Sequence, residues 1–343
     1  MTDSLPGSPL PDTDLWRCAA KWLTDGRTIA LATVVDTWGS APVPLGGQMV
    51  IATPDQFQGS VSGGCVEVDV ITAALELIDS GQGQLLSFGV SNETAWQQGL
   101  PCGGTIEVFV ERLSPAEGLE FANTMATARD NRVSILIETN LKTGQRRLYQ
   151  PSDDMPPGHT ELFAQGRSKR IKSECEELFL QILQPAPKIL IVGATHIAQA
   201  LVAHLNIVDA SAVVIDPRDS FASQARFGET EIRNEWPAEA FETLDVDEHT
   251  AVVVLAHVAQ IDDEALTWAL KSKARFIGAL GSRRNHKKRC ERLKAAGFSD
   301  QDLARIRCPI GLNIGAVTPE EIALATAAEI VMTFRQPRPR EET

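Results

Sequence analysis

Residues 188–198 read Lys188-Ile189-Leu190-Ile191-Val192-Gly193-Ala194-Thr195-His196-Ile197-Ala198. The apolar residues 189–192 are typical of a strand that is buried on both faces, and a helix-like segment follows them. Gly193 therefore stands between a strand and a helix, where a dinucleotide-binding fold carries its G-x-G-x-x-G/A loop. Asp216 ends the next apolar run, at the position where such folds hold a ribose hydroxyl. The stretch predicts a Rossmann-like parallel sheet.

The rest of the C-terminal half repeats this alternation of strands and helices. A last helix begins with the capping box Thr318-Pro319-Glu320-Glu321, which places proline in the first helical position. Strands that are apolar on both faces and alternate with helices indicate a doubly wound α/β domain, which we assign to residues 186–335. Its expected strands are 188–193, 211–216, 250–257 and 275–282, and its other expected helices are 196–205, 262–270 and 284–296.

The loops of this half suggest a ligand without identifying it. Thr195 replaces the second glycine, which lets the backbone approach a pyrophosphate, so the pattern supports the fold better than it supports NAD binding. Arg218 could meet a phosphate or pair with Asp216. His196 and His257 fall near strand ends, where such sheets bind ligands, although each could equally be a structural histidine. An NAD(P)-dependent oxidoreductase is one hypothesis that these residues leave open.

A basic segment follows the expected strand 275–282. Residues 283–294 hold seven lysines and arginines against the single acidic Glu291. Arg283 and Arg284 lie at a strand-to-helix turn, which makes them the better candidates for an anionic ligand. An exposed helix face with no specific role is the better interpretation for four of the other basic residues, Lys287, Lys288, Arg289 and Lys294.

Two cysteines in the N-terminal half are flanked by glycine pairs, in Gly63-Gly64-Cys65 and Cys102-Gly103-Gly104. Glycine pairs let backbone amides approach a ligand that a side chain would exclude. Cys65 precedes an apolar-periodic run over residues 66–77, so we expect it at a helix N-terminus, where a thiolate or a bound anion is favoured. The alternative is that the glycines form tight turns and that the thiols are small buried groups.

The N-terminal half has a different pattern of expected helices and strands from the Rossmann-like half. We expect a helix at 14–23 and strands at 28–36, 47–53, 85–88 and 105–111, which together form an α+β domain over residues 14–115. Residues 116–185 are expected to hold a helix at 119–129, a hairpin of strands 132–139 and 145–149, and a proline-rich linker from residue 150 to a domain boundary near Pro185.

Composition narrows the possible classes of function. A chain of 343 residues suggests two domains, and its net charge of −13 argues against general nucleic-acid binding. No secretory signal or membrane-length apolar run is found, so we expect a cytoplasmic protein that makes no membrane contact. Its six cysteines lack the spacing of a structural zinc site, and disulfides are not expected in that compartment. Any special thiol is therefore ligand-binding or reactive.

Two segments of the N-terminal half resemble the signatures of the XdhC/CoxI family: residues 59–67, GSVSGGCVE, and residues 99–109, GLPCGGTIEVF. The C-terminal half agrees in order and spacing, with DPR at 216–218, GALGSRR at 278–284, PIGLNIG at 309–315 and TPEEIA at 318–323. The sequence departs from the family pattern at Thr195, where a glycine is usual, and at Ala256-His257-Val258, where Thr-His-Asp is usual.

The resemblance implies an accessory factor rather than an enzyme with its own turnover. Members of the family serve molybdenum hydroxylases of the xanthine, aldehyde and CO dehydrogenase type. The protein is then expected to bind the molybdenum cofactor, as molybdopterin or its dinucleotide form, and to protect it while a cysteine desulfurase adds the terminal sulfur. It would then insert the cofactor into the large subunit of the client enzyme. A homodimer is a further expectation.

The same resemblance, together with the motifs above, selects the expected cofactor-binding residues. Cys65 or Cys102 could contact molybdenum or its sulfur, and we favour Cys65 because we expect it at a helix N-terminus. The expected set is Ser62, Gly63, Gly64, Cys65, Glu67, Cys102, Gly103, Gly104, Gly193, His196, Asp216, Arg218, His257 and Arg283.

Overall fold

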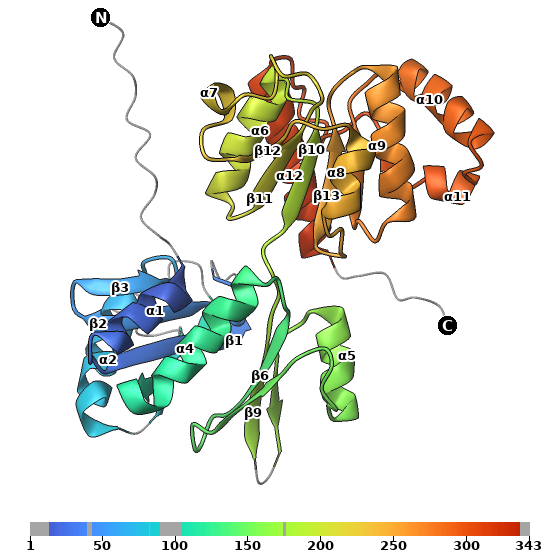
Figure 1. Ribbon diagram of the computed structural model, residues 1–343. Helices are drawn as coiled ribbons and strands as arrows, with labels where there is room; N and C mark the ends of the chain where they lie inside the picture. Colours follow the sequence, from blue (N-terminus) through green and yellow to red (C-terminus); the bar gives the residue numbers. More distant parts are fainter. Residues whose placement is uncertain (1–13, 40–42, 82, 90–103, 174–175, 337–343) are drawn as a thin grey trace, which may run out of the picture. The chain divides into compact units, whose positions relative to one another are not determined.

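The structure is a computed structural model, and it describes residues 14–39, 43–81, 83–89, 104–173 and 176–336. The chain forms two compact units, Met1–Pro185 and Ala186–Thr343 (Figure 1). Each unit has its own sheets and its own buried core.

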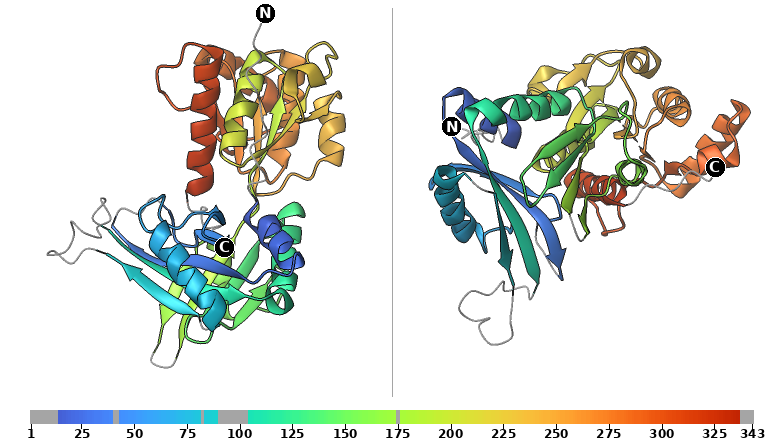
Figure 2. Two further views of the ribbon diagram at one scale, coloured as in Figure 1. Left: turned by 90° about the vertical axis from the view of Figure 1, so that its left-hand side faces the viewer. Right: turned by 90° about the horizontal axis from the view of Figure 1, so that it is seen from below.

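The first unit is built on a five-stranded antiparallel sheet in the order β3-β2-β1-β5-β4. Helix α2 covers one face of this sheet, because Val66, Val70, Ala74 and Leu77 recur at helical spacing and pack on the strands (Figure 2). The elements are β1 Ile29–Trp38, β2 Gln48–Thr53, β3 Gln56–Gly59, α2 Glu67–Ser80, β4 Gln84–Phe88 and β5 Thr105–Leu113.

The opposite face of this sheet packs on helices α1, Leu15–Thr24, and α4, Pro115–Asp130. Asp14 caps α1, since its carboxylate accepts the amide of Trp16 at 2.9 Å. Trp16 meets Phe121 of α4 edge-to-face, with ring centroids 5.1 Å apart. Because β1 alternates its apolar side chains between the two faces, the central strand is buried over seven consecutive residues.

A second antiparallel sheet in this unit has the order β7-β6-β9-β8. Two of its strands fall in the segment that sequence patterns assign to a linker, and so does helix α5. That assignment is wrong for residues 157–165, 169–172 and 177–183. The side chain of Arg170 on β8 is only 6% exposed and pairs with Glu107 of β5 and Glu177 of β9, which ties the two sheets together. The elements are β6 Ile135–Asn140, β7 Arg146–Tyr149, α5 Pro157–Gln165, β8 Lys169–Lys172 and β9 Glu177–Leu183.

The second unit is a doubly wound parallel sheet in the order β12-β11-β10-β13-β14-β15, which confirms the predicted Rossmann-like fold. Side chains of the central β10 alternate between two cores: Ile189 and Ile191 face α6 and α12, and Leu190 and Val192 face α8 and α9. Figure 2 shows α12 on one side of this sheet. The strands are β10 Lys188–Val192, β11 Ser211–Ile215, β12 Glu231–Arg233, β13 Thr250–Val254, β14 Phe276–Ala279 and β15 Ile306–Arg307.

The helices of the second unit follow the strands in turn. The final helix begins as predicted, with Thr318 as N-cap, a capping box to Glu321 and Pro319 in the first turn. The helices are α6 His196–Ile207, α7 Gln224–Phe227, α8 Pro237–Thr243, α9 Ala259–Lys271, α10 Arg283–Ala295, α11 Asp300–Leu303 and α12 Pro319–Arg335.

Two backbone segments approach each other so closely at the end of β10 that residue 193 must be glycine. Its φ is +107°, and a Cβ at this position would lie 2.3 Å from the backbone nitrogen of Ala256. Its amide donates to the carbonyl of Ile215 at 2.8 Å. Only glycine allows β10, β11 and the end of β13 to meet in this way.

We expect Gly193→Ala to destabilise the second unit by about 3 kcal/mol or more, because the clash is with rigid backbone and the φ is unfavourable. Gly315→Ala is the matched control, since Gly315 also has a positive φ but nothing lies within 4 Å of its added Cβ. The control should cost only about 1 kcal/mol. Urea denaturation followed by pulse proteolysis of the second unit measures both. Equal losses for the two variants would contradict the steric argument.

Candidate functional site

The first glycine-flanked cysteine lies on the loop between β3 and α2. Cys65 is exposed and directly precedes Val66, the N-cap of α2, so it sits just outside the helix rather than in its first turn. Gly63 and Gly64 have φ values of +77° and +114°, which glycine adopts readily. The two glycines let residues 60–65 curl back over the start of α2.

The carboxylate of Glu67, the first residue of α2, fills the inside of this loop. Its Oε1 accepts the amides of Ser62 at 2.9 Å and Gly63 at 3.0 Å, and its Oε2 accepts the amide of Gly64 at 2.8 Å. The amide of Val61 and the hydroxyls of Ser60 and Ser62 also donate to it. Six donors therefore converge on one carboxylate, which is the arrangement of an anion-binding nest.

This convergence of donors changes the pKa of Glu67. Burial by itself raises the pKa of Glu67, but the hydrogen bonds from Ser60 and Ser62 outweigh it and lower the pKa to about 2. The sequence predicted that these amides would hold an anion. The anion that they hold in this structure is a side chain of the same chain.

Ser62 connects this carboxylate to the cysteine. Its side chain is fully buried, and its hydroxyl donates to Glu67 while accepting the amides of Cys65 at 3.0 Å and Val66 at 2.9 Å. Ser62 thus satisfies amides at the start of α2, where no capping side chain comes from Val66 itself.

The second glycine-flanked cysteine can be placed only in part. Cys102 and Gly103 lie outside the described residues. Gly104 is buried and directly precedes β5. Its neighbour Thr105 pairs with Trp38 at the end of β1.

In the second unit, Asp216 is a buried carboxylate just after β11. Its Oδ1 accepts the amide of Arg218 at 3.0 Å and the Nε of Arg218 at 2.8 Å. Its Oδ2 accepts the Nη2 of Arg218 at 2.6 Å and the amide of Ala194 at 2.8 Å. Burial raises the pKa of Asp216, but these bonds outweigh burial and lower it. Of the two predicted roles for Arg218, the structure shows the pairing with Asp216.

The other predicted residues of this unit share one edge of the parallel sheet. His196 follows β10, His257 follows β13 and Arg283 follows β14, and all three are exposed. Carboxyl ends of parallel strands form the usual ligand edge of such sheets. His257 has a φ of +57°, a conformation that is rare outside glycine and that tends to occur at functional positions. The fold thus brings these residues and Gly193 to one edge.

Arg289 corrects the interpretation of the basic segment. It is 4% exposed rather than on the outer face of α10, and its Nη2 donates to Asp262 Oδ2 at 3.0 Å and to the carbonyl of Leu280 at 3.1 Å. Burial raises the pKa of Asp262, and the charge of Arg289 opposes the rise. Sequence reasoning missed Asp262, whose signal is its place in the first turn of the helix after β13.

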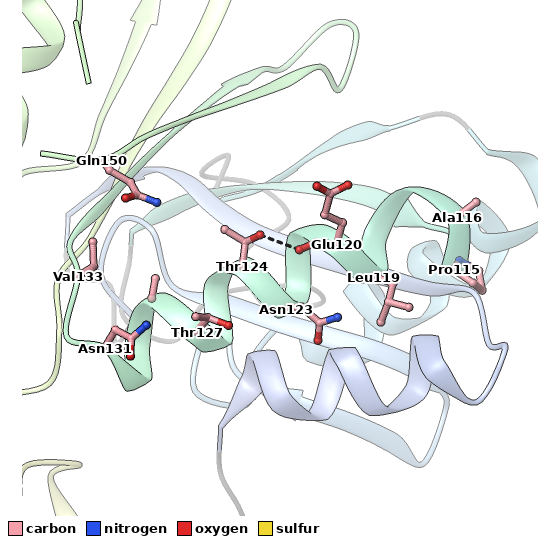
Figure 3. Close-up of a pocket in the computed structure, with 11 residues that line it drawn as sticks. Pro115, Ala116, Leu119, Glu120, Asn123, Thr124, Thr127, Asn131, Val133 and Gln150 are labelled. Atoms are coloured by element: carbon pink, nitrogen blue, oxygen red, sulfur yellow. Dashed lines mark hydrogen bonds between the residues drawn. The ribbon is translucent and has the colours of Figure 1, made fainter. Parts of the chain in front are cut away.

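An open groove of about 670 Å³ runs along the outer face of α4 (Figure 3). Its lining mixes apolar side chains with uncharged polar ones and one carboxylate; the polar residues are Glu120, Asn123, Thr124, Thr127, Asn131 and Gln150. None of the predicted site residues lines it. The groove therefore offers no cationic or thiol side chain for an anionic, metal-containing ligand.

The described residues show neither a metal-binding cluster nor a membrane-spanning helix. They contain no group of three or more histidine, cysteine, aspartate or glutamate side chains that could hold a metal ion. Among the helices of these residues, none has both the length and the apolar character that a bilayer crossing requires.

Comparison with known proteins matches both units. Residues 22–89 match the XdhC and CoxI family, and residues 189–330 match the XdhC Rossmann domain. The chain is 30% identical over 317 residues to the molybdenum cofactor insertion chaperone PaoD of Escherichia coli, a match that covers 92% of this chain and 86% of PaoD. It is 25% identical over 322 residues to a Bacillus subtilis protein described as a probable xanthine dehydrogenase subunit, covering 92% and 96% of the two chains.

A solved structure shares the fold. The chain superimposes with a TM-score of 0.72 on a Bacillus halodurans protein described as a xanthine dehydrogenase, over 95% of this chain and 98% of that one. The two sequences are 23% identical, so this likeness concerns the fold alone.

The exposure of Cys65 leads to a testable difference in thiol reactivity. Burial raises the pKa of the Cys290 and Cys308 thiols, whereas Cys65 is exposed. In the native protein at neutral pH, iodoacetamide should therefore modify Cys65 at least about tenfold faster than Cys290 and Cys308. Peptide mapping by mass spectrometry at successive times gives the three rates. Comparable rates would mean that the loop shields Cys65.

Proposed function

This chain belongs to the XdhC and CoxI family, and from that premise we propose that it binds the molybdenum cofactor as cargo and inserts it into a xanthine-dehydrogenase-type hydroxylase. Support comes from a relative that is described as a molybdenum cofactor insertion chaperone and is similar over most of both chains. A second relative of similar length is named for xanthine dehydrogenase.

The observation that carries this proposal is an exposed thiol on a fixed loop. Cys65 lies on a segment whose amides are held by Glu67 and Ser62, so its backbone is fixed while its side chain faces solvent. Thiolate sulfur is a soft ligand that suits a transition metal. A single accessible thiol can hold such a cargo and still release it to another protein, whereas a closed set of protein ligands would retain it.

The Rossmann-like unit is proposed to hold the phosphate or nucleotide end of the cargo. Arg283 is the first residue of α10 and is exposed, so its planar guanidinium is available to a phosphate at the ligand edge of the sheet. His196 and His257 lie at the same edge. Protection of the cofactor during sulfuration by a cysteine desulfurase, and self-association, are further parts of the proposal.

The geometry at Asp216 weighs against the oxidoreductase alternative. A nicotinamide dinucleotide would place a ribose hydroxyl on this carboxylate. Its two oxygens already accept four hydrogen bonds, from the amides of Ala194 and Arg218 and from the Arg218 guanidinium. A ribose hydroxyl would therefore have to compete with the Arg218 guanidinium for this carboxylate.

Direct binding tests the proposal. We expect the anaerobically purified chain to bind molybdenum cofactor near-stoichiometrically and Cys65→Ala to weaken that binding by about tenfold or more, because a direct sulfur contact is lost. Cys18→Ala is the matched control, since Cys18 lies within α1, away from the Cys65 loop in sequence, and should bind as wild type does. Equilibrium binding with metal and pterin analysis gives the affinities. Equal affinity for all three proteins would remove Cys65 from the site.

The client enzyme provides the second test. In a strain that lacks this protein, the hydroxylase should be folded and should carry its iron–sulfur clusters and flavin, but it should lack active molybdenum cofactor. The measurement is the metal, pterin and flavin content of the purified client. A fully loaded and active client would defeat the proposal, and loss of the clusters as well would indicate a more general assembly role.

A further inference from the structure

From sequence, Glu67 is expected to contact the cofactor, and the structure shows which groups of the same chain its carboxylate contacts. Its carboxylate faces into the loop, toward the amides of residues 61–64 and the hydroxyls of Ser60 and Ser62. A phosphate could use these amides only by displacing a carboxylate that is anchored on the first turn of α2. The loop therefore meets a ligand through the side chain that it leaves exposed, which is Cys65.

We propose that Glu67 is a positioning residue, whose carboxylate holds the Ser60–Cys65 loop in the conformation that presents the Cys65 thiol to the cargo. This inference rests on the proposed function for the identity of the cargo. It also assigns the glycine-flanked amides a structural task, so that the phosphate of the cargo is bound elsewhere.

A relay of hydrogen bonds carries the effect of Glu67 to the cysteine. The hydroxyl of Ser62 can donate only one proton, and it donates that proton to Glu67. Its lone pairs are then directed to the amides of Cys65 and Val66, at 3.0 and 2.9 Å. The ionised carboxylate thus fixes the orientation of the Ser62 hydroxyl, and that hydroxyl in turn holds the backbone amide of Cys65.

The substitution Glu67→Gln breaks this relay while preserving the shape of the side chain. An amide group offers one oxygen and one NH₂ donor, and the NH₂ would face the donors that now bind Oε1 or Oε2. At least one loop amide or the Ser62 hydroxyl then loses its acceptor. The loop should open locally, whereas Val70, Ala74 and Leu77 keep α2 packed on its sheet.

The matched control is Asp69→Asn, which removes the same charge from the same first turn of α2. Asp69 is exposed and does not enter the loop. An effect that arose only from negative charge near the helix N-terminus would appear equally in both variants.

The first experiment measures hydrogen exchange of the backbone amides of residues 61–66 in the cargo-free protein. We expect Glu67→Gln to lower their protection by about tenfold, with Asp69→Asn unchanged and the interior of α2 protected in all proteins. Unchanged protection in Glu67→Gln would overturn the proposal. If Glu67→Gln fails to fold, Ser62→Ala interrupts the same relay and should give the same local loss of protection.

The second experiment is a double-mutant cycle on molybdenum cofactor affinity with Glu67→Gln and Cys65→Ala. Glu67→Gln should weaken binding by about tenfold in the wild-type background. It should have no further effect in the Cys65→Ala background, because it acts through that thiol. Equal losses in both backgrounds would overturn the proposal, since Glu67 would then act independently of Cys65. Tighter binding in Glu67→Gln would also overturn it, because the carboxylate would then be a plug that the cargo displaces.

The two experiments separate this inference from the proposed function. If wild-type protein binds no molybdenum cofactor, the proposed function fails, and with it the part of the inference that names the cargo. The exchange measurement needs no cargo and still decides whether Glu67 holds the Cys65 loop.

Discussion

A backbone amide that leaves a strand or enters a helix needs an acceptor, and in this protein side-chain carboxylates often supply it. Glu67 accepts the amides of the loop before α2, and Asp216 accepts the amide of Ala194 after β10. Glu321 accepts the amides of Val317 and Thr318 before α12. The Cys65 loop, the turn after β10 and the start of α12 are thus each shaped by an internal carboxylate, and the placement of Cys65 and Gly193 depends on these contacts.

The patterns that sequence predicted well are those with a strong period. The strands of the second unit are apolar on both faces, because helices cover both sides of the sheet, and this gives unbroken runs that are easily recognised. The capping box at Thr318 is a local signal and was equally readable. The second sheet of the first unit was partly missed, because β8 is a short, mostly charged strand and its partner β9 lies in a segment bounded by prolines.

The sequence indicated which residues belong to the candidate site, but not which contacts these residues make. Sequence located Cys65, Gly193 and Asp216 from their positions in motifs, but it could not show that Glu67 and Arg218 fill the acceptor and donor places that a ligand would use. Those pairings depend on how a loop curls, which residue spacing alone does not determine. Arg289 shows the same limit, because a buried and an exposed arginine look alike within a run of basic residues.

The Glu67 carboxylate inside the Cys65 loop also determines which solutes can reach the amides of the loop. A carboxylate attached to the first residue of α2 is present at an effective concentration in the millimolar range or above, because it cannot diffuse away. Free phosphate, nucleotides and other small anions must displace it from six donors before they reach the amides. The amides of the loop are therefore insulated from the anions that surround the protein, while the Cys65 side chain stays exposed.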